Sequence, residues 1–218
     1  MTEPKSLLIT GAQELGVELS TRQHEQLIEL LAELAEWNQR FNLTAIEDPL
    51  EAVRKHLLDS LSIHPHLRGH RIADVGSGAG FPGLPLAVAA PSREFTLIEA
   101  TGKKAQFLEH ARMKLGLANV IVVNSRAEQL KPASRFDSVT ARALGKLNEF
   151  IRVAGHLVAR GGLLLAMKGQ ASQTEIEKLP RGWEVKAIHR LIVPGLDAQR
   201  HLVELQPKQP QRSFRRGH

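Results

Sequence analysis

The chain of 218 residues contains no cysteine and no apolar run long enough to cross a bilayer. The first absence excludes disulfide bonds and thiolate metal sites. The chain also lacks a long apolar run, and its N-terminus lacks the pattern of a signal peptide. We therefore expect a soluble, cytoplasmic protein without a membrane partner. We also expect a monomer without a metal ion. A chain of this length can bury a sizeable core.

The formal net charge of +6 is distributed unevenly along the chain. Residues 1–68 hold 6 Lys or Arg and 11 Asp or Glu, residues 69–205 hold 19 and 12, and the remaining residues hold 4 and none. A basic surplus on the later part of the chain favours a polyanionic partner, most simply RNA. The surplus fits equally well a surface charge that only maintains solubility.

The segment from Ile72 to Gly83 combines a short apolar run with four glycines in its last eight residues. It predicts a strand that ends in a ligand-binding loop, because glycine allows positive φ and a close approach to the backbone. Gly76 and Gly78 would form the turn, and Pro82 suits the first position of a following helix. An ordinary turn needs only one or two glycines, so we favour the binding loop.

Two cofactors of different charge are compatible with this loop. Gly78-Ala79-Gly80-Phe81-Pro82-Gly83 satisfies the G-x-G-x-x-G dinucleotide pattern, and Glu99 lies at the spacing expected for a ribose-binding acid. However, Asp74 precedes the turn, and Pro82 lacks an amide N–H that a pyrophosphate would need. A negative charge repels a diphosphate but suits S-adenosylmethionine, which carries a sulfonium and an ammonium. The loop therefore favours S-adenosylmethionine over NAD.

Alternating strand and helix patterns after residue 70 predict an α/β fold. A capping box from Ser20 to Gln23 begins a predicted helix that ends near Asn42, and a second helix is expected from about Pro49 to Leu61. We expect a helical cap at 1–68, a larger domain at 69–206 and a disordered basic tail at 207–218. The larger domain is predicted to contain strands at 72–75, 94–99, 119–123, 136–141 and 162–168, helices at 84–90, 102–115, 147–158 and 172–179, and an antiparallel pair at 183–193 and 201–205.

Asp74 and Glu99 each end a predicted strand. If these strands are parallel neighbours, both carboxylates reach the sheet edge at which open α/β folds bind ligands. Glu99 can accept hydrogen bonds from both ribose hydroxyls of an adenosine. A surface ion pair with Lys103 or Lys104 is the alternative for Glu99.

Two more groups follow strands toward the same edge. The backbone N–H of Ala127 or Glu128 can donate to an adenine nitrogen, and Ser125 can instead, or as well, cap a helical turn. Arg142 ends the fourth predicted strand. Its charge suits a phosphate or the carboxylate of the methyl donor better than the cationic sulfonium.

Short motifs along nearly the whole chain carry a resemblance: Phe41-Asn42-Leu43-Thr44, His56-Leu57-Leu58-Asp59-Ser60, Asp74–Leu86, Gly102-Lys103-Lys104, Ser125–Glu128, Ala141-Arg142-Ala143 and Met167-Lys168-Gly169. Together they resemble the glucose-inhibited division protein B family, which comprises bacterial small-subunit (16S) ribosomal RNA guanine-N7 methyltransferases.

The resemblance implies a Rossmann-like class I S-adenosylmethionine-dependent methyltransferase sheet with helices on both faces, preceded by a small helical extension. It also implies donor contacts at Gly76, Phe81, Ala127, Glu128 and Arg142. Glu99-Ala100-Thr101 departs slightly from the acid-serine turn of the family, and the tail after Gln206 lies outside the family pattern.

What the sequence lacks also constrains the reaction. Methylation at pyrimidine C5 normally uses a cysteine, and methylation of an exocyclic amine usually uses an acid or amide followed by Pro-Pro and an aromatic residue; both are absent. Guanine N7 has an exposed lone pair and no proton at neutral pH, so its methylation needs positioning and electrostatic balance but no general base. We therefore predict methyl transfer from S-adenosylmethionine to N7 of a specific guanine in 16S ribosomal RNA or a small-subunit precursor.

On the donor side, we predict that Asp74 and Glu99 hold the polar ends of S-adenosylmethionine. Gly76 and Gly78 would pass beneath the donor, and Phe81 would pack on it. The target guanine must leave its stack to reach such a site.

On the acceptor side, Arg126, Arg142 and Lys168 are the predicted catalytic residues, which would grip a phosphate or the guanine edge. His56 and Arg200 are further candidates. For each of these residues a structural ion pair is the alternative. His56 also lies one helical turn from Asp59, either as a solvated pair or as an orienting contact.

Three other functions fit parts of the sequence. A NAD-dependent oxidoreductase would use the dinucleotide pattern, and a methyltransferase could act on a substrate other than RNA. A non-catalytic RNA-binding assembly factor would use the basic surplus alone. The loop from Asp74 to Gly83 argues against this last function, because a pure binding module has no need of it.

Overall fold

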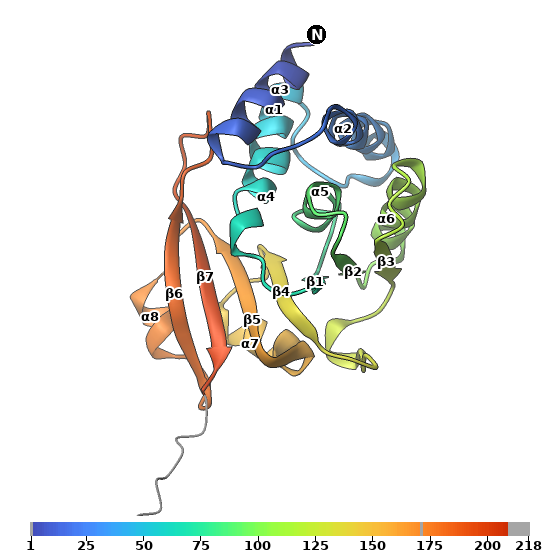
Figure 1. Ribbon diagram of the computed structural model, residues 1–218. Helices are drawn as coiled ribbons and strands as arrows, with labels where there is room; N and C mark the ends of the chain where they lie inside the picture. The colour runs from blue at the N-terminus through green and yellow to red at the C-terminus, as the bar shows by residue number, and fades with distance from the viewer. Residues whose placement is uncertain (1, 171, 209–218) are drawn as a thin grey trace, which may run out of the picture.

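A seven-stranded sheet forms the centre of the protein (Figure 1). The computed structural model describes residues 2–170 and 172–208. The strand order is β3-β2-β1-β4-β5-β7-β6, and β7 is antiparallel to both of its neighbours while the pairs from β3 to β5 are parallel. The strands are β1 (Arg71–Val75), β2 (Glu94–Ile98), β3 (Val120–Val123), β4 (Phe136–Arg142), β5 (Val158–Lys168), β6 (Trp183–Leu191) and β7 (Arg200–Pro207). The predicted α/β fold and the closing antiparallel pair are confirmed.

Helices lie on both faces of the sheet. Their bounds are α1 (Glu3–Glu14), α2 (Thr21–Phe41), α3 (Pro49–Ala52), α4 (Asp59–Leu61), α5 (Gly83–Ala89), α6 (Gly102–Lys114), α7 (Leu147–Ala154) and α8 (Gln173–Glu177). A π-helical stretch, η1 (Val53–Leu58), joins α3 to α4, so residues 49–61 form one continuous helical segment. The 3-10 turns are η2 (His64–His66), η3 (Ala127–Gln129) and η4 (Gly155–Leu157).

The predicted start of the long helix α2 is confirmed in detail. The Ser20 hydroxyl accepts a bond from the Gln23 N–H, and the Gln23 side chain accepts one from the Ser20 N–H. Sequence reasoning missed α1. This helix buries only Leu8, Gly11 and Ala12, and a glycine within a helix weakens its signal. A Cβ on Gly11 would lie 2.5 Å from Cδ1 of the fully buried Leu58, so any larger residue there would force the Leu58 side chain to move.

Some boundaries of the predicted elements also differ in the structure. The helix expected at 147–158 ends at Ala154, and Val158 already begins β5, where it pairs with Phe136 of β4. The apolar run Leu157-Val158 fits either structure, and pairing with β4 decides for the strand. Pro82 lies just before α5, whose first residue is Gly83.

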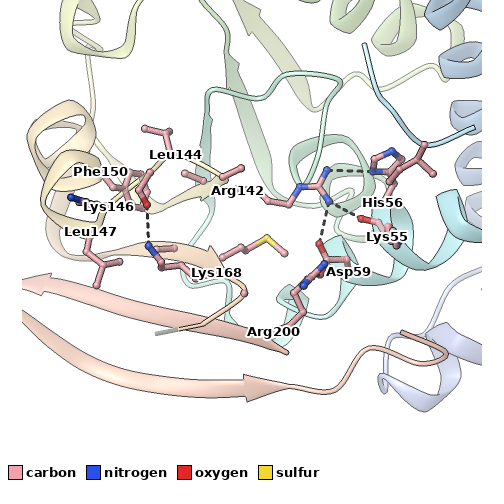
Figure 2. Close-up of a pocket in the computed structure, with 17 residues that line it drawn as sticks. Lys55, His56, Asp59, Arg142, Leu144, Lys146, Leu147, Phe150, Lys168 and Arg200 are labelled. Carbon is pink, nitrogen blue, oxygen red and sulfur yellow. Dashed lines mark hydrogen bonds and ion pairs between the residues drawn. The ribbon is translucent and has the colours of Figure 1, made fainter. Parts of the chain in front are cut away.

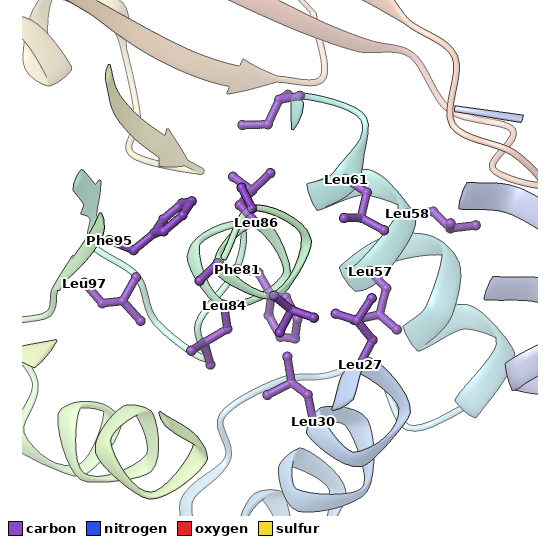
Figure 3. Packing of buried hydrophobic residues seen from close by; sticks show 14 of the residues in the cluster. Leu27, Leu30, Leu57, Leu58, Leu61, Phe81, Leu84, Leu86, Phe95 and Leu97 are labelled. Atoms are coloured by element: carbon purple, nitrogen blue, oxygen red, sulfur yellow. The ribbon is translucent and has the colours of Figure 1, made fainter. Parts of the chain in front are cut away.

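The hydrophobic core lies in two layers, one on each face of the sheet. Residues from α1, α2, the helical segment 49–61, α5 and α6 share one cluster with the sheet, and Figure 3 shows Leu27 and Leu30 beside Leu57 and the α5 residue Leu84. The other cluster packs α7 on the opposite face. The N-terminal helices therefore bury the same face of the sheet as α5 and α6.

The C-terminal end of the chain is described as far as Lys208. Pro207 is the last residue of β7, and the Lys208 N–H donates to the Gly182 carbonyl. The rest of the tail that was predicted to be disordered lies outside the described residues. Among the helices of the described ranges, none combines the length and the apolar character that a bilayer crossing requires.

Candidate active site

The glycine loop after β1 turns across the end of β2. Gly76, Gly78 and Gly80 have φ of +67°, +58° and +90°, which side chains with a Cβ rarely adopt. The Ile98 carbonyl at the end of β2 accepts hydrogen bonds from the N–H groups of Gly76 and Ser77. The loop therefore exposes its backbone at the carboxyl edge of the sheet, as the sequence predicts.

The carboxylates at the tips of β1 and β2 both bond to this loop. Glu99 Oε2 accepts from the Gly78 N–H at 2.8 Å, and Oε1 accepts from the Thr101 N–H at 2.8 Å. Asp74 Oδ2 accepts from the Gly83 N–H at 3.1 Å. The two acids thus reach the same edge, and backbone N–H groups, rather than Lys103 or Lys104, are the partners of Glu99 within the described residues.

Asp74 is buried beneath the loop, with 1% of its surface exposed. Its Oδ1 accepts from the Thr140 hydroxyl at 3.1 Å. Burial raises the pKa of Asp74 to about 6, although the bonds from Thr140, Ser77 and Gly83 oppose this shift. In this arrangement Asp74 anchors the start of α5, and its direct contact with a donor stays a prediction.

A pocket of about 630 Å³ opens beside the loop, between the ends of β4 and β5 and the helical segment 49–61 (Figure 2). This volume is typical of small-ligand sites. A Cβ on Gly76 would lie 3.4 Å from Leu144, which lines the pocket, so the glycine loop borders it. The charged or titratable residues of its lining are Lys55, His56, Asp59, Arg142, Lys146, Lys168 and Arg200.

Arg142 crosses from the end of β4 to the helical segment 49–61. Its Nη1 donates to the Lys55 carbonyl at 2.8 Å and to Asp59 Oδ2 at 3.1 Å. The Asp59 N–H bonds to the carbonyls of Arg54 and His56 rather than to that of Lys55, which would be its partner in a regular α-helix. The π-helical stretch, a form of helix often found at functional sites, thus supplies an acceptor for Arg142.

His56 is held between Thr44, Phe81 and Arg142. Its Nε2 lies 3.0 Å from Thr44 Oγ1, and its ring stacks on Phe81 with centroids 4.4 Å apart. Burial, followed by the positive charge of Arg142, lowers the pKa of His56 to about 4. The ring is therefore neutral near pH 7. In this arrangement Nδ1 can accept from Arg142 Nη2 at 3.4 Å, and Nε2–H can donate to Thr44.

Phe81 is buried under this cluster rather than exposed at the loop surface. The Arg142 guanidinium carbon lies 5.4 Å from the centroid of its ring. The predicted contact of Phe81 with the donor stays a prediction. What the structure adds is a role in supporting His56 and Arg142.

Lys168 and Arg200 also reach the pocket, and each is already paired. Lys168 Nζ lies 2.7 Å from Glu175 Oε2 and donates to the Gly145 carbonyl at 3.0 Å. Arg200 Nε donates to Asp59 Oδ1 at 2.9 Å. Asp59 was considered only as a partner of His56, and it instead joins Arg142 and Arg200.

The structure does not bring Arg126 to the pocket. Arg126 is exposed beyond β3, and β2 and β1 separate β3 from β4 in the sheet. Ala127 and Glu128 lie in the adjacent turn η3, with Ala127 buried and Glu128 exposed. The Ser125 hydroxyl donates to the Arg126 carbonyl, so the alternative that Ser125 caps this turn is wrong.

The pocket is positively charged, and its lining contains one carboxylate. That carboxylate, Asp59, is 3% exposed and is shared by Arg142 and Arg200. Apolar side chains, among them Leu144, Leu147 and Phe150, form the opposite wall. The pocket thus suits a flat, electron-rich group with nearby negative charge, and it offers no carboxylate that is free to remove a proton.

Residues 23–203 match the sequence model of the protein family that is described as rRNA small subunit methyltransferase G. The chain belongs to this family. It is 48% identical to the ribosomal RNA small subunit methyltransferase G of Nitrosococcus oceani over 204 aligned residues. The alignment covers 94% of this chain and 95% of that protein. The family member from Stenotrophomonas maltophilia is 51% identical over 177 residues, 81% of this chain and 84% of that protein.

Solved structures support the fold. A SAM-dependent methyltransferase from Aquifex aeolicus matches with a TM-score of 0.56 at 17% identity, over 75% of this chain and 96% of that one. A SAM-dependent methyltransferase from Geobacter sulfurreducens, in complex with S-adenosyl-L-homocysteine, matches with a TM-score of 0.52 at 12% identity, over 81% and 98%. The chain is thus a class I, S-adenosylmethionine-dependent methyltransferase of the small-subunit rRNA methyltransferase G family. The predicted fold, family, enzyme class and methyl donor are confirmed.

Proposed function

We propose that this enzyme transfers the methyl group of S-adenosylmethionine to N7 of a guanine in small-subunit (16S) ribosomal RNA. The observation that carries the choice of atom is the pocket beside the glycine loop, whose single carboxylate is paired with two arginines. An acceptor that must lose a proton would need a base there. Guanine N7 has a free lone pair and needs none.

On the donor side, we propose that the residues around the glycine loop bind S-adenosylmethionine. The glycines leave space that a Cβ would occupy, and Gly78 has only the Gly76 carbonyl within 4 Å of such an atom. Glu99 lies at this edge with one bond to each oxygen, so each oxygen keeps a lone pair for a ribose hydroxyl. When bound, the cofactor supplies an electrophilic methyl group. The proposed contacts are Asp74, Gly76, Gly78, Phe81, Glu99, Ala127, Glu128 and Arg142.

On the acceptor side, we propose that Arg142, Lys168 and Arg200 hold a phosphate or the O6 edge of the guanine, while Leu144 and Phe150 pack on the base. Their pairing with Asp59 and Glu175 fixes the side chains before RNA arrives, which lowers the entropy cost of binding. Arg126 is more suitably placed for RNA backbone outside the pocket. Action on ribosomal RNA, the substrate in the names of the relatives, leads us to propose a cytoplasmic enzyme.

A labelling experiment tests this function. The protein is incubated with S-adenosylmethionine carrying a radioactive methyl group and either free 16S rRNA or assembled small subunits, and the RNA is then cleaved with borohydride and aniline. We expect labelled RNA and chain cleavage at a 7-methylguanosine. Label at another atom would contradict the N7 assignment. Label in protein or small molecules, with none in RNA, would contradict the substrate class.

A further inference from the structure

Three ligand-type side chains, two of them on β6 and β7, meet away from the methyl-transfer pocket. His66 lies in η2 just before β1, His189 lies on β6, and Glu204 lies on β7. Among residues 2–170 and 172–208, this is the only group of at least three His, Asp or Glu residues whose ligand atoms all lie within 4.8 Å of one another. Chain segments more than 120 positions apart in sequence therefore converge here.

The distances between these side chains fit a common metal ion. His189 Nε2 lies 3.0 Å and His66 Nδ1 lies 3.6 Å from Glu204 Oε1. Two ligands at 2.0–2.1 Å from a tetrahedral Zn²⁺ are separated by about 3.4 Å. These two distances lie on either side of that value, and the ligand atoms of His66 and His189 lie within 4.8 Å of each other, so modest side-chain movements would admit an ion.

Burial gives a second reason to expect a cation. Glu204 is 3% exposed, and within the described residues its ion-pair partners are the two histidines, with no lysine or arginine among them. A buried carboxylate is costly without a positive partner. The side chains of His66 and His189 are 23% and 35% exposed, so an ion could enter from solvent and keep a water ligand.

We propose that His66, His189 and Glu204 form a binding site for a divalent transition metal ion, with Zn²⁺ as the ion that fits best. Two imidazole nitrogens and one carboxylate oxygen are ligands that Zn²⁺ accepts, and three protein ligands plus water complete a tetrahedral shell. Calcium and magnesium prefer oxygen ligands and fit this set less well.

The metal ion would join three parts of the fold. Glu204 and His189 lie on the antiparallel pair β6–β7, and His66 lies in the connection from the helical segment 49–61 to β1. These ligands come together only in the folded chain, so the ion would stabilise the native state. Since none of the three residues lines the methyl-transfer pocket, this role is independent of the proposed function.

Titration calorimetry of the full-length, chelator-treated protein with zinc chloride tests the site. We expect one tight site per chain and a rise in melting temperature on addition of Zn²⁺. His189→Ala removes one ligand and should weaken binding by more than about 100-fold, because loss of a mere hydrogen-bond partner of a ligand already costs about 10–100-fold. Co²⁺ substituted for Zn²⁺ should give the visible absorption of a four-coordinate site in wild type and should not give it in His189→Ala.

The matched control is His110→Ala. His110 pairs with Glu33 at 2.6 Å, but within the part of the chain that the structure describes this pair belongs to no group of three ligand residues, so this variant should bind Zn²⁺ like wild type. Glu204→Gln is a second test variant, checked for folding by circular dichroism, and should also lose the tight site. Equal Zn²⁺ affinity in wild type and His189→Ala would mean binding at other histidines and would overturn the proposal. Absence of a tight site in wild type would overturn it as well.

Discussion

Arg142 and Asp59 are 83 positions apart in the chain, and their side chains meet at 3.1 Å beside the pocket. The other carboxylate oxygen of Asp59 holds Arg200 of β7 at 2.9 Å. A residue of the helical segment 49–61 thus supplies the negative charge for arginines from two strands. The position of both cations depends on how the N-terminal helices pack on the sheet.

Replacing Arg142 with Ala should reduce kcat/KM for methyl transfer by about 100-fold or more, the usual loss when one positioned donor is removed from a site. The fold should persist, because Asp59 keeps its bond to Arg200. Methyl incorporation into small-subunit rRNA measures the effect, with the exposed Arg160→Ala as the matched control. Arg126→Ala should lower kcat/KM less than Arg142→Ala does. An equal decrease would indicate that Arg126 also acts in the active site. Unchanged turnover in Arg142→Ala would show that Arg142 has no role there.

Asp59→Asn should destabilise the protein by about 1–3 kcal/mol, because two partly buried arginines lose their shared counter-charge. It should also lower methyl transfer by releasing both arginines. Urea unfolding gives the stability. Glu109→Gln breaks a partly exposed pair with Arg112 on a single helix and should cost about 0–1 kcal/mol. If both variants lose the same small amount, Asp59 does not organise the pocket.

Asp74 should make stability depend on pH. Its pKa is about 6 in the folded protein and 3.8 for an ordinary aspartate, so between about pH 4 and 6 the folded state binds the proton more tightly. The contribution of Asp74 to the free energy of unfolding therefore falls as pH rises over this range, by on the order of 3 kcal/mol. Asp74→Asn mimics the neutral acid, and it can still accept from Gly83 and donate to the Thr140 hydroxyl. Relative to wild type, this variant should gain stability between pH 4 and 6.

Urea unfolding at pH 4.5 and pH 7 measures that gain. Asp197→Asn, the same substitution at an exposed position, serves as the matched control. A difference between Asp74→Asn and wild type that stays constant with pH would contradict the raised pKa.

His56 should act in the opposite direction over nearly the same range. Its pKa is about 4 in the folded protein and 6.5 for an ordinary histidine, so the unfolded chain takes up the proton first as pH falls. Stability from this group is present above about pH 6.5 and is lost by about pH 4. His56→Gln should remove this loss, so the advantage of wild type over the variant should shrink as pH falls. Unfolding at pH 5 and pH 7 tests it, with the exposed His156→Gln as control, and an advantage that does not change with pH would contradict it.

Local chemistry allowed much of the fold to be predicted. The Ser20–Gln23 capping box marks the start of α2, and the glycines after Asp74 mark the end of β1. The location of Glu99 at the same sheet edge as Asp74 also followed from the sequence, because the carboxyl ends of neighbouring parallel strands share an edge, and Glu99 indeed bonds to the glycine loop.

What the sequence could not reveal depends on contacts between distant residues. The helix α1 has a weak pattern of its own and is fixed by packing of Gly11 against Leu58. The bonds of Asp59 to Arg142 and Arg200 were not predicted, because spacing on one helix suggests only a partner one turn away. The sequence spacing showed that His56 lies close to Asp59 on one helix. That both side chains face Arg142 became clear only from the folded structure.

The shared apolar cluster on one face of the sheet also bears on how this enzyme can be engineered. Leu27 and Leu57 are fully buried in the same cluster as Leu84 and Phe95. A truncated protein that starts at β1 would expose this apolar face to solvent. Arg142 would also lose its hydrogen bonds to the Lys55 carbonyl and the Asp59 carboxylate. Swapping catalytic modules between relatives should therefore carry the first helices along with the sheet.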